Sequence, residues 1–236
     1  MTTTSNISGY LSTAEASHVL GSTSHHVARL ARDGEIASLR TAGDALLVDA
    51  SSLYVYKQIS RGKGRPFSNR MAFAALWELS GLEAPWLSYA QRRRLRIKLA
   101  DTTAEDLVWV TRKRAVERRY RASASFLPRI KERMILSGRT RETSGALGLV
   151  ASDDVVEGYA RLDDLADLAR SFFLEDDPRG NVVVHAEDWL PDVEGSTMPE
   201  AVVAVDLAAS LDTRGRSAGL AKLKELIDGY ANGSDS

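Results

Sequence analysis

Residues 12–53 read STAEASHVLGSTSHHVARLARDGEIASLRTAGDALLVDASSL, and this stretch decides how the N-terminal part of the chain folds. Ser12 precedes Glu15 by three residues, which is the capping-box spacing that starts a helix. We expect Gly21 to end that helix and Thr23 to cap the next one. The stretch therefore predicts two short helices joined by a tight turn.

The second predicted helix has an apolar side and a basic side. Val27, Leu30 and Ala31 follow i, i+3, i+4 spacing and so face inward. The opposite side carries an imidazole and two cations, also at helical spacing: His25, Arg29 and Arg32. Such a helix suits the major groove of DNA. A helical hairpin that only stabilises a core is the alternative, but it gives the basic stripe no purpose.

A β-hairpin is predicted after the second helix. Residues 36–40 alternate like a strand, and residues 45–48 form its partner across a turn that contains a glycine. The two strands would make a wing with Arg40 at its base. Either Asp49 or Ser51 can then cap a third helix.

The order of helix, helix, hairpin and helix resembles the excisionase-like branch of the MerR helix-turn-helix superfamily. The matching pieces are YLSTAEAS, GSTSHHVARLARDGEI and VDASSL. Proteins of that family bind duplex DNA, so the resemblance implies base readout by Ser24, His25 and Arg29 and phosphate contacts by Arg32 and Arg40. The candidate DNA-binding residues of this module are Ser24, His25, His26, Arg29, Arg32 and Arg40.

Charge divides the chain into two parts. Residues 1–144 carry 24 Lys and Arg against 13 Asp and Glu, whereas residues 145–236 carry 7 against 19. This asymmetry indicates a nucleic-acid-binding part and a part with another task. There is no cysteine, which excludes disulfides and thiolate metal sites. Without signal-peptide features or an apolar run of about 20 residues, the chain is expected to be cytoplasmic and to have no membrane partner.

A basic linker, RGKGRP, spans residues 61–66. Its two glycines favour flexibility, and its cations attract phosphates. The centre of the segment looks like an AT-hook, in which an arginine enters the narrow minor groove of A·T-rich DNA. A plain basic linker is the alternative. The candidate DNA contacts here are Arg61, Lys63 and Arg65.

The middle of the chain is helical and basic. Helices are predicted over residues 68–79 and 88–100, and the second begins with a capping box of Ser88 and Gln91. Cations gather within the second helix and again at residues 112–114 and 118–121. Two alternatives stay open: solvated faces, or a positive surface that extends the DNA footprint or holds RNA. Interleaved aromatics are sparse, which disfavours single-strand binding.

The acidic part mixes strands and helices. Residues 155–160 and 181–186 have the β-branched content of buried strands. A capping box of Thr197 and Glu200 is expected to start an apolar helix that only Asp206 interrupts. No catalytic triad, metal-ligand spacing or glycine-rich phosphate loop is visible. The four histidines are dispersed, so we expect no catalysis, no cofactor and no metal site.

A second resemblance covers most of the chain after residue 64. The pieces GRPFSNRMAFAALWELSG, RRRLRIKL, VEGYARLDDLADLARSFFL, NVVVHA and MPEAVVAVDLAASLDTRGRSAGLAKLKELI are similar to AbiEi-type antitoxins of abortive-infection toxin–antitoxin systems. Those proteins join a winged helix to an α/β antitoxin domain, repress their own operon and counteract a nucleotidyltransferase-like toxin.

The sequence thus predicts an α+β fold that is mainly α. Residues 1–60 form a winged helix-turn-helix, residues 61–67 a linker and residues 68–236 an antitoxin-like domain with a basic helical part (68–144) and an acidic α/β part (145–236). The expected function is a DNA-binding autorepressor and antitoxin, with its own operator, a cognate toxin and a second copy of itself as partners. The alternatives are an excisionase-like architectural protein that bends DNA, and a module that binds protein or RNA.

Overall fold

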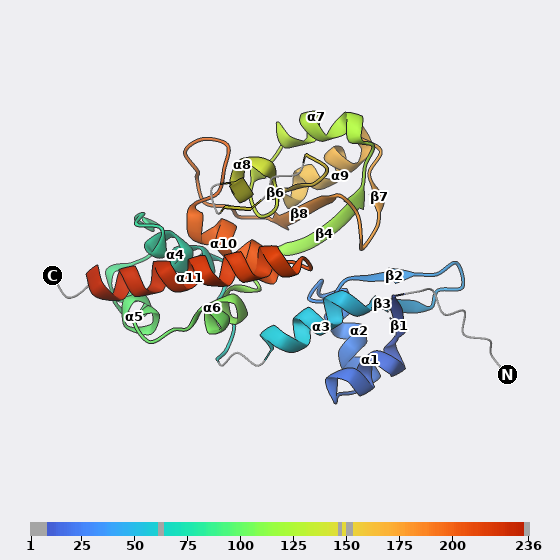
Figure 1. Ribbon diagram of the computed structural model, residues 1–236, viewed down its shortest axis with the longest axis horizontal. Coiled ribbons are helices and arrows are strands. Elements are labelled where there is room, and N and C mark those ends of the chain that lie inside the picture. The colour runs from blue at the N-terminus through green and yellow to red at the C-terminus, as the bar shows by residue number, and fades with distance from the viewer. Residues whose placement is uncertain (1–8, 61–63, 146–147, 150–152, 234–236) are drawn as a thin grey trace.

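A computed structural model describes residues 9–60, 64–145, 148–149 and 153–233. The fold is α+β, about 51% helical and 15% strand, which confirms the predicted mainly α class. Figure 1 shows an N-terminal module beside a layer of helices, with a five-stranded sheet and its helices above both. In the described part of the chain, no helix has the length and apolar character needed to cross a bilayer.

The N-terminal module, residues 9–60, packs helices against a small antiparallel sheet with strand order β1-β3-β2. Its elements are β1 (Tyr10–Ser12), α1 (Thr13–Leu20), α2 (Ser24–Arg32), β2 (Ser38–Arg40), β3 (Leu46–Asp49) and α3 (Ala50–Ile59). The module has a core of its own, built from Ala16, Val27, Leu30, Ala31, Ile36, Val48, Leu53 and Tyr56. Apolar residues from every helix thus meet beneath the sheet.

Local signals in the sequence set the ends of these helices. Ser12 and Glu15 form the predicted capping box, in which Glu15 Oε2 accepts a hydrogen bond from the Ser12 N–H over 2.8 Å. Gly21 ends α1 at φ 63°, a left-handed conformation that costs glycine little. Thr23 caps α2, and Asp49 rather than Ser51 caps α3. Strand β1 was not predicted, because its three residues merge with the capping box.

The helical layer contains α4 (Asn69–Leu79), α5 (Tyr89–Leu99), α6 (Ala104–Thr111), α10 (Glu200–Ala209) and α11 (Thr213–Gly233). Helices α4 and α6 pack on α10 and α11, so residues from both parts of the chain share the largest core. The apolar helix α10 is buried nearly all round, as expected. The predicted capping box before it is wrong: Pro199 is the N-cap residue, and Thr197 forms a β-bridge with Leu136 instead.

The five-stranded sheet is mixed, with order β5-β6-β8-β4-β7. Its strands are β4 (Val116–Arg121), β5 (Ile135–Leu136), β6 (Val156–Arg161), β7 (Glu175–Asp176) and β8 (Val182–Glu187). Strands β6 and β8 are parallel and α9 (Leu162–Ser171) connects them, whereas β4 runs antiparallel to β8. The short helices η1 (Ala124–Phe126), α7 (Leu127–Lys131) and α8 (Arg141–Ser144) complete this part.

Candidate nucleic-acid interface

Helix α2 separates its two kinds of side chain onto opposite sides. Val27, Leu30 and Ala31 are buried in the core of the N-terminal module. The predicted contact residues Ser24, His25, Arg29 and Arg32 are exposed, whereas His26 is half-buried. A turn of only three residues separates α1 from α2, and this short connection helps to fix how α2 lies against the rest of the module.

His26 and Arg29 form one unit on the surface of α2. The guanidinium Nη2 of Arg29 lies 3.0 Å from Nδ1 of His26, one helical turn earlier. The backbone N–H of His26 donates to the Oγ1 of Thr23, so the first turn of the helix is fixed. His26 is therefore placed to orient Arg29, and the guanidinium keeps its other donors for a ligand.

Arg40, near the tip of the hairpin, forms an ion pair that is exposed to solvent. Arg40 Nη1 lies 2.6 Å from Oδ1 of Asp44, and their side chains are 63% and 84% exposed. An exposed ion pair of this kind contributes about 0–1 kcal/mol, so a phosphate can replace the carboxylate at little cost. Asp44 adopts φ 61° in the turn between β2 and β3. Arg40 is thus the last residue of β2, beside the turn, and not at the base of the hairpin, where the sequence pattern places it.

Of the three predicted linker cations, the structure describes Arg65. Arg61 and Lys63 lie outside the described residues. Arg65 is exposed. Next to it, the carbonyl oxygen of Gly64 accepts a hydrogen bond from Trp109 Nε1 over 3.0 Å. Trp109 also packs edge-on against Tyr56 of α3, and so the described end of the linker is fixed between the N-terminal module and α6.

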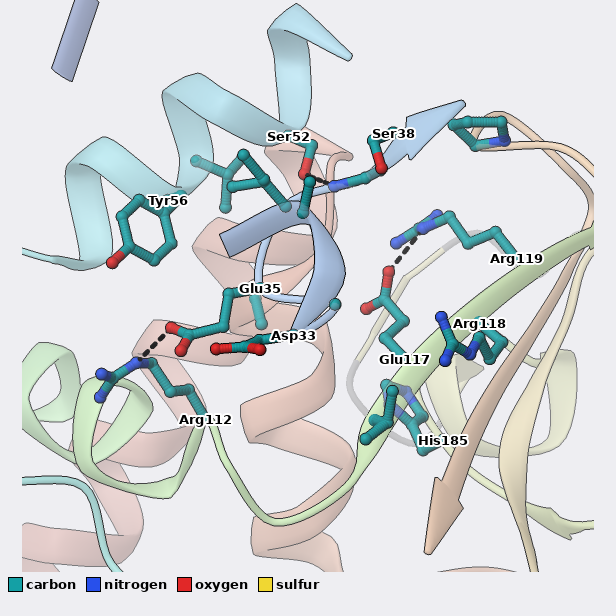
Figure 2. A pocket seen from close by; sticks show the side chains of 18 of the residues that line it. Asp33, Glu35, Ser38, Ser52, Tyr56, Arg112, Glu117, Arg118, Arg119 and His185 are labelled. Atoms are coloured by element: carbon teal, nitrogen blue, oxygen red, sulfur yellow. Dashed lines mark hydrogen bonds and ion pairs between the residues drawn. The ribbon is translucent and has the colours of Figure 1, made fainter. Parts of the chain in front are cut away.

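A cavity of about 810 Å³ lies between the N-terminal module and β4. Two unbroken segments, residues 33–40 and 112–119, supply much of its lining. In Figure 2 an ion pair stands on each side: Glu35 with Arg112 on one, and Glu117 with Arg119 on the other. The main charges of the cavity walls therefore balance one another.

Glu35 joins the module to the chain after α6. Its two carboxylate oxygens lie 2.9 Å from Arg112 Nε and 3.0 Å from Lys113 Nζ. Burial alone would raise the pKa of Glu35, but the hydrogen bonds and charges of Arg112 and Lys113 outweigh it and lower that pKa. Within the predicted basic cluster at residues 112–114, Arg112 and Arg114 are thus drawn into the fold, whereas Lys113 pairs with Glu35 and stays 47% exposed.

A buried polar cluster lies where β6, β8 and α10 meet. Asp206 accepts hydrogen bonds from Arg114 Nη2 and Ser137 Oγ, and from the Tyr159 hydroxyl over 2.9 Å. Arg114 Nε also donates to the Tyr159 oxygen over 2.7 Å. All four side chains are buried. Each charge is therefore compensated by a partner, which buried charges require.

Glu157 and His185 extend this cluster. His185 Nε2 lies 3.0 Å from Glu157 Oε1 and 3.8 Å from Asp206 Oδ1. The Arg139 backbone N–H donates to the other oxygen of Glu157 over 3.0 Å. Gly138, at φ 53°, permits this approach, because a Cβ there would stand 2.1 Å from the Glu157 carboxyl carbon.

Burial and neighbouring charges have opposite effects on the pKa values of Glu157 and His185. Burial would raise the pKa of Glu157, but the hydrogen bond and charge of His185 and the charge of Arg139 hold it at about 2. Burial would lower the pKa of His185, but the charges of Asp206 and Glu157 raise it above its usual value. The two groups therefore favour each other's charged forms.

Glu157, His185 and Asp206 offer three ligand atoms within 4.8 Å of one another, a grouping that could hold a metal ion. Each side chain already has hydrogen-bond partners, and the guanidinium of Arg114 supplies the positive charge beside Asp206. A metal ion would have to displace that guanidinium, at the cost of a buried ion pair. We therefore assign the cluster to the stability of the fold.

Comparisons with models of protein families, with curated proteins and with solved structures find no match to this chain.

The sequence contains a signal for the buried cluster that residue spacing does not reveal. Glu157, His185 and Asp206 each interrupt an apolar run, VVEGYA, NVVVHA and AVVAVDLAA. A titratable residue inside a buried run needs a partner, so three such runs predict that the three residues meet. Arg114 carries no comparable signal, because its basic neighbours suggest a surface position.

Proposed function

We propose that this chain is a sequence-specific DNA-binding autorepressor that also acts as an antitoxin against a nucleotidyltransferase-like toxin. In this proposal the N-terminal module is a winged helix-turn-helix. Helices α1 and α2 are its helix-turn-helix, with α2 in the major groove, and β2 and β3 are its wing.

The observation that carries the DNA-binding proposal is the division of α2 into a buried apolar side and an exposed polar side. Ser24, His25 and Arg29 are available to base edges, because all three are exposed. Arg32 and Arg40 are exposed and available to phosphates. Contacts to bases give specificity, and contacts to phosphates give affinity and register.

The operator is proposed to be an inverted repeat that two copies of the chain bind. A helix-turn-helix reads only a few base pairs, so two modules related by a two-fold axis give a longer site. Arg61, Lys63 and Arg65 of the linker add phosphate contacts in this arrangement.

The antitoxin part of the proposal rests on the resemblance of residues 64–236 to AbiEi-type antitoxins. The excess of carboxylates in residues 145–236 supports it, with 19 acidic against 7 basic residues. A toxin that handles nucleotides or tRNA needs a basic surface, which would attract an acidic partner.

Co-expression tests this proposal. The chain is expressed together with the nucleotidyltransferase-like protein encoded beside it, and growth and promoter activity are measured. We expect the chain to restore growth and to repress its promoter. Arg29→Ala is the matched variant: it should lose repression and keep neutralisation. The absence of a neighbouring toxin gene, or growth inhibition that the chain does not relieve, would remove the antitoxin part.

A further inference from the structure

Ion pairing within the fold distinguishes the basic clusters of the sequence from one another. Arg112 and Lys113 bind Glu35, and Arg114 binds Asp206. In the next cluster the partners are likewise acidic: Arg119 with Glu117, and Arg121 with Asp177. Most of these cations are therefore held by the fold itself.

Helix α5 differs from these clusters. Its sequence YAQRRRLRIKL contains five cations and no carboxylate. Glu78 of α4 binds two of them, Arg92 and Arg96. Among the residues that the structure describes, Arg93, Arg94 and Lys98 have no acidic partner, and all three are exposed. The helix therefore keeps an uncompensated positive surface.

Packing and capping fix the orientation of the basic surface of α5. Leu95 and Leu99 are buried in the largest core and fix the inward side of the helix. At 100° per residue, Arg93 and Arg94 project from the opposite side. Ser88 and Gln91 form a capping box that fixes its first turn. Tyr89, 84% exposed, adds a hydroxyl that can donate to a phosphate.

We propose that α5 is a second DNA-contacting element, which binds backbone phosphates of the same duplex beyond the base pairs that α2 reads. This inference rests on the proposed DNA-binding function. Figure 1 shows α5 and the α1–α2 pair at the two ends of one edge of the molecule, away from the five-stranded sheet. A duplex is the occupant that fits an uncompensated cationic helix on that edge, because its phosphates offer regularly spaced negative charge.

The test compares Arg93→Gln/Arg94→Gln with wild type over a series of salt concentrations. Losing two phosphate contacts should lower the slope of log affinity against log salt by about 1.8. At about 0.1 M salt we expect a loss on the order of tenfold, equal on operator and random duplex. Arg161→Gln/Arg214→Gln is the matched control, because both arginines are exposed and without a carboxylate partner among the described residues. It should leave the slope unchanged.

Duplex length gives an independent readout. On a duplex of about 12 base pairs that holds one half-site, wild type and the α5 variant should bind alike. Adding about 10 flanking base pairs should strengthen wild-type binding only. An unchanged salt slope, an equal loss in the control variant, or a loss confined to binding of tRNA would overturn the inference. Failure of the proposed function is a different result: wild type would then bind operator and random duplex equally, and the α5 contribution would still be measurable on random duplex.

Discussion

Arg179 donates a hydrogen bond from Nε to Oδ2 of Asp49 over 3.1 Å, and this bond joins the loop before β8 to the N-terminal module. The Asp49 side chain is fully buried and also caps α3. Arg179 Nη2 donates to the carbonyl oxygen of Gly9 as well. One side chain thus binds both chain segments at the end of the β1–β3 pair where Tyr10 pairs with Asp49.

We expect Arg179→Ala to lower the free energy of unfolding by about 1–3 kcal/mol, because it leaves a buried carboxylate with one hydrogen bond fewer. Urea unfolding of the full chain measures this change. Arg170→Ala is the control, since Arg170 is exposed and its ion pair with the exposed Asp167 is long, at 3.8 Å. Its effect should stay within about 0.5 kcal/mol. Equal effects of the two substitutions would show that the Asp49 contact adds nothing.

Arg29→Ala should reduce operator affinity by about 1–3 kcal/mol, because a bidentate contact to a guanine edge would be lost. The measurement is a titration of operator and of scrambled duplex at one salt concentration. The loss should be confined to the operator. If scrambled duplex loses as much, Arg29 contacts phosphate and the base readout lies elsewhere on α2.

The buried ion pair of Arg114 and Asp206 is suited to a double-mutant cycle. Arg114→Met alone should destabilise the fold by about 3–5 kcal/mol, because Asp206 is left as an uncompensated buried charge. Combining it with Asp206→Leu should cost much less than the sum of the two single substitutions. Ser137→Ala removes one donor to Asp206 and should destabilise the fold by about 1–2 kcal/mol. It tests the same cluster if Arg114→Met does not fold. Additive effects would mean that the pair is not coupled.

Stability should depend on pH through Glu157 and His185. The pKa of Glu157 is depressed to about 2, so its contribution is complete above the usual carboxylate range and is lost as the pH falls toward 2. The pKa of His185 is raised, so its contribution is complete below about 6.5 and is lost as the pH rises through the folded-state value.

Unfolding free energies of wild type and His185→Gln between about pH 5 and 9 test this pH dependence. The advantage of wild type should be largest at the acidic end and should shrink as the pH rises above the usual histidine value. A constant difference across that range would show that His185 does not titrate with folding.

Residues 1–60 should fold without the rest of the chain, because the N-terminal module has its own core. The fragment loses the contacts of Trp109, Arg112 and Arg179, so it should be less stable than in the full chain. We expect it to bind duplex DNA weakly. Circular dichroism and a titration against operator duplex measure both properties; an unfolded fragment would place the domain boundary elsewhere.

Features that depend on near neighbours were predictable from the sequence. The capping boxes at Ser12 and Ser88, the end of α1 at Gly21 and the buried side of α2 all follow from residues within one or two turns. The strands β6 and β8 were also predictable, because valines mark their starts: Val155 and Val156 at β6, and Val182, Val183 and Val184 in β8.

Features that depend on distant partners were not predictable. Arg114 looks like part of a surface cluster, but its partner Asp206 lies 92 residues away. The capping box predicted at Thr197 does not form, because Thr197 is in a β-bridge with Leu136. Likewise, the spacing of cations along the chain does not show which of them form ion pairs. The partners of Arg112 and Arg96, which are Glu35 and Glu78, lie far from them in the sequence. Tertiary pairing thus decides which basic residues stay free for a ligand.

Competition binding to the DNA immediately upstream of the gene is the most direct test of a sequence-specific reader. The full chain is titrated against that duplex at two salt concentrations, with an excess of random duplex present. We expect a complex that survives the competitor at both concentrations, because base contacts persist when phosphate contacts are screened. A complex that the random duplex removes completely would contradict specific recognition and leave only the phosphate contribution.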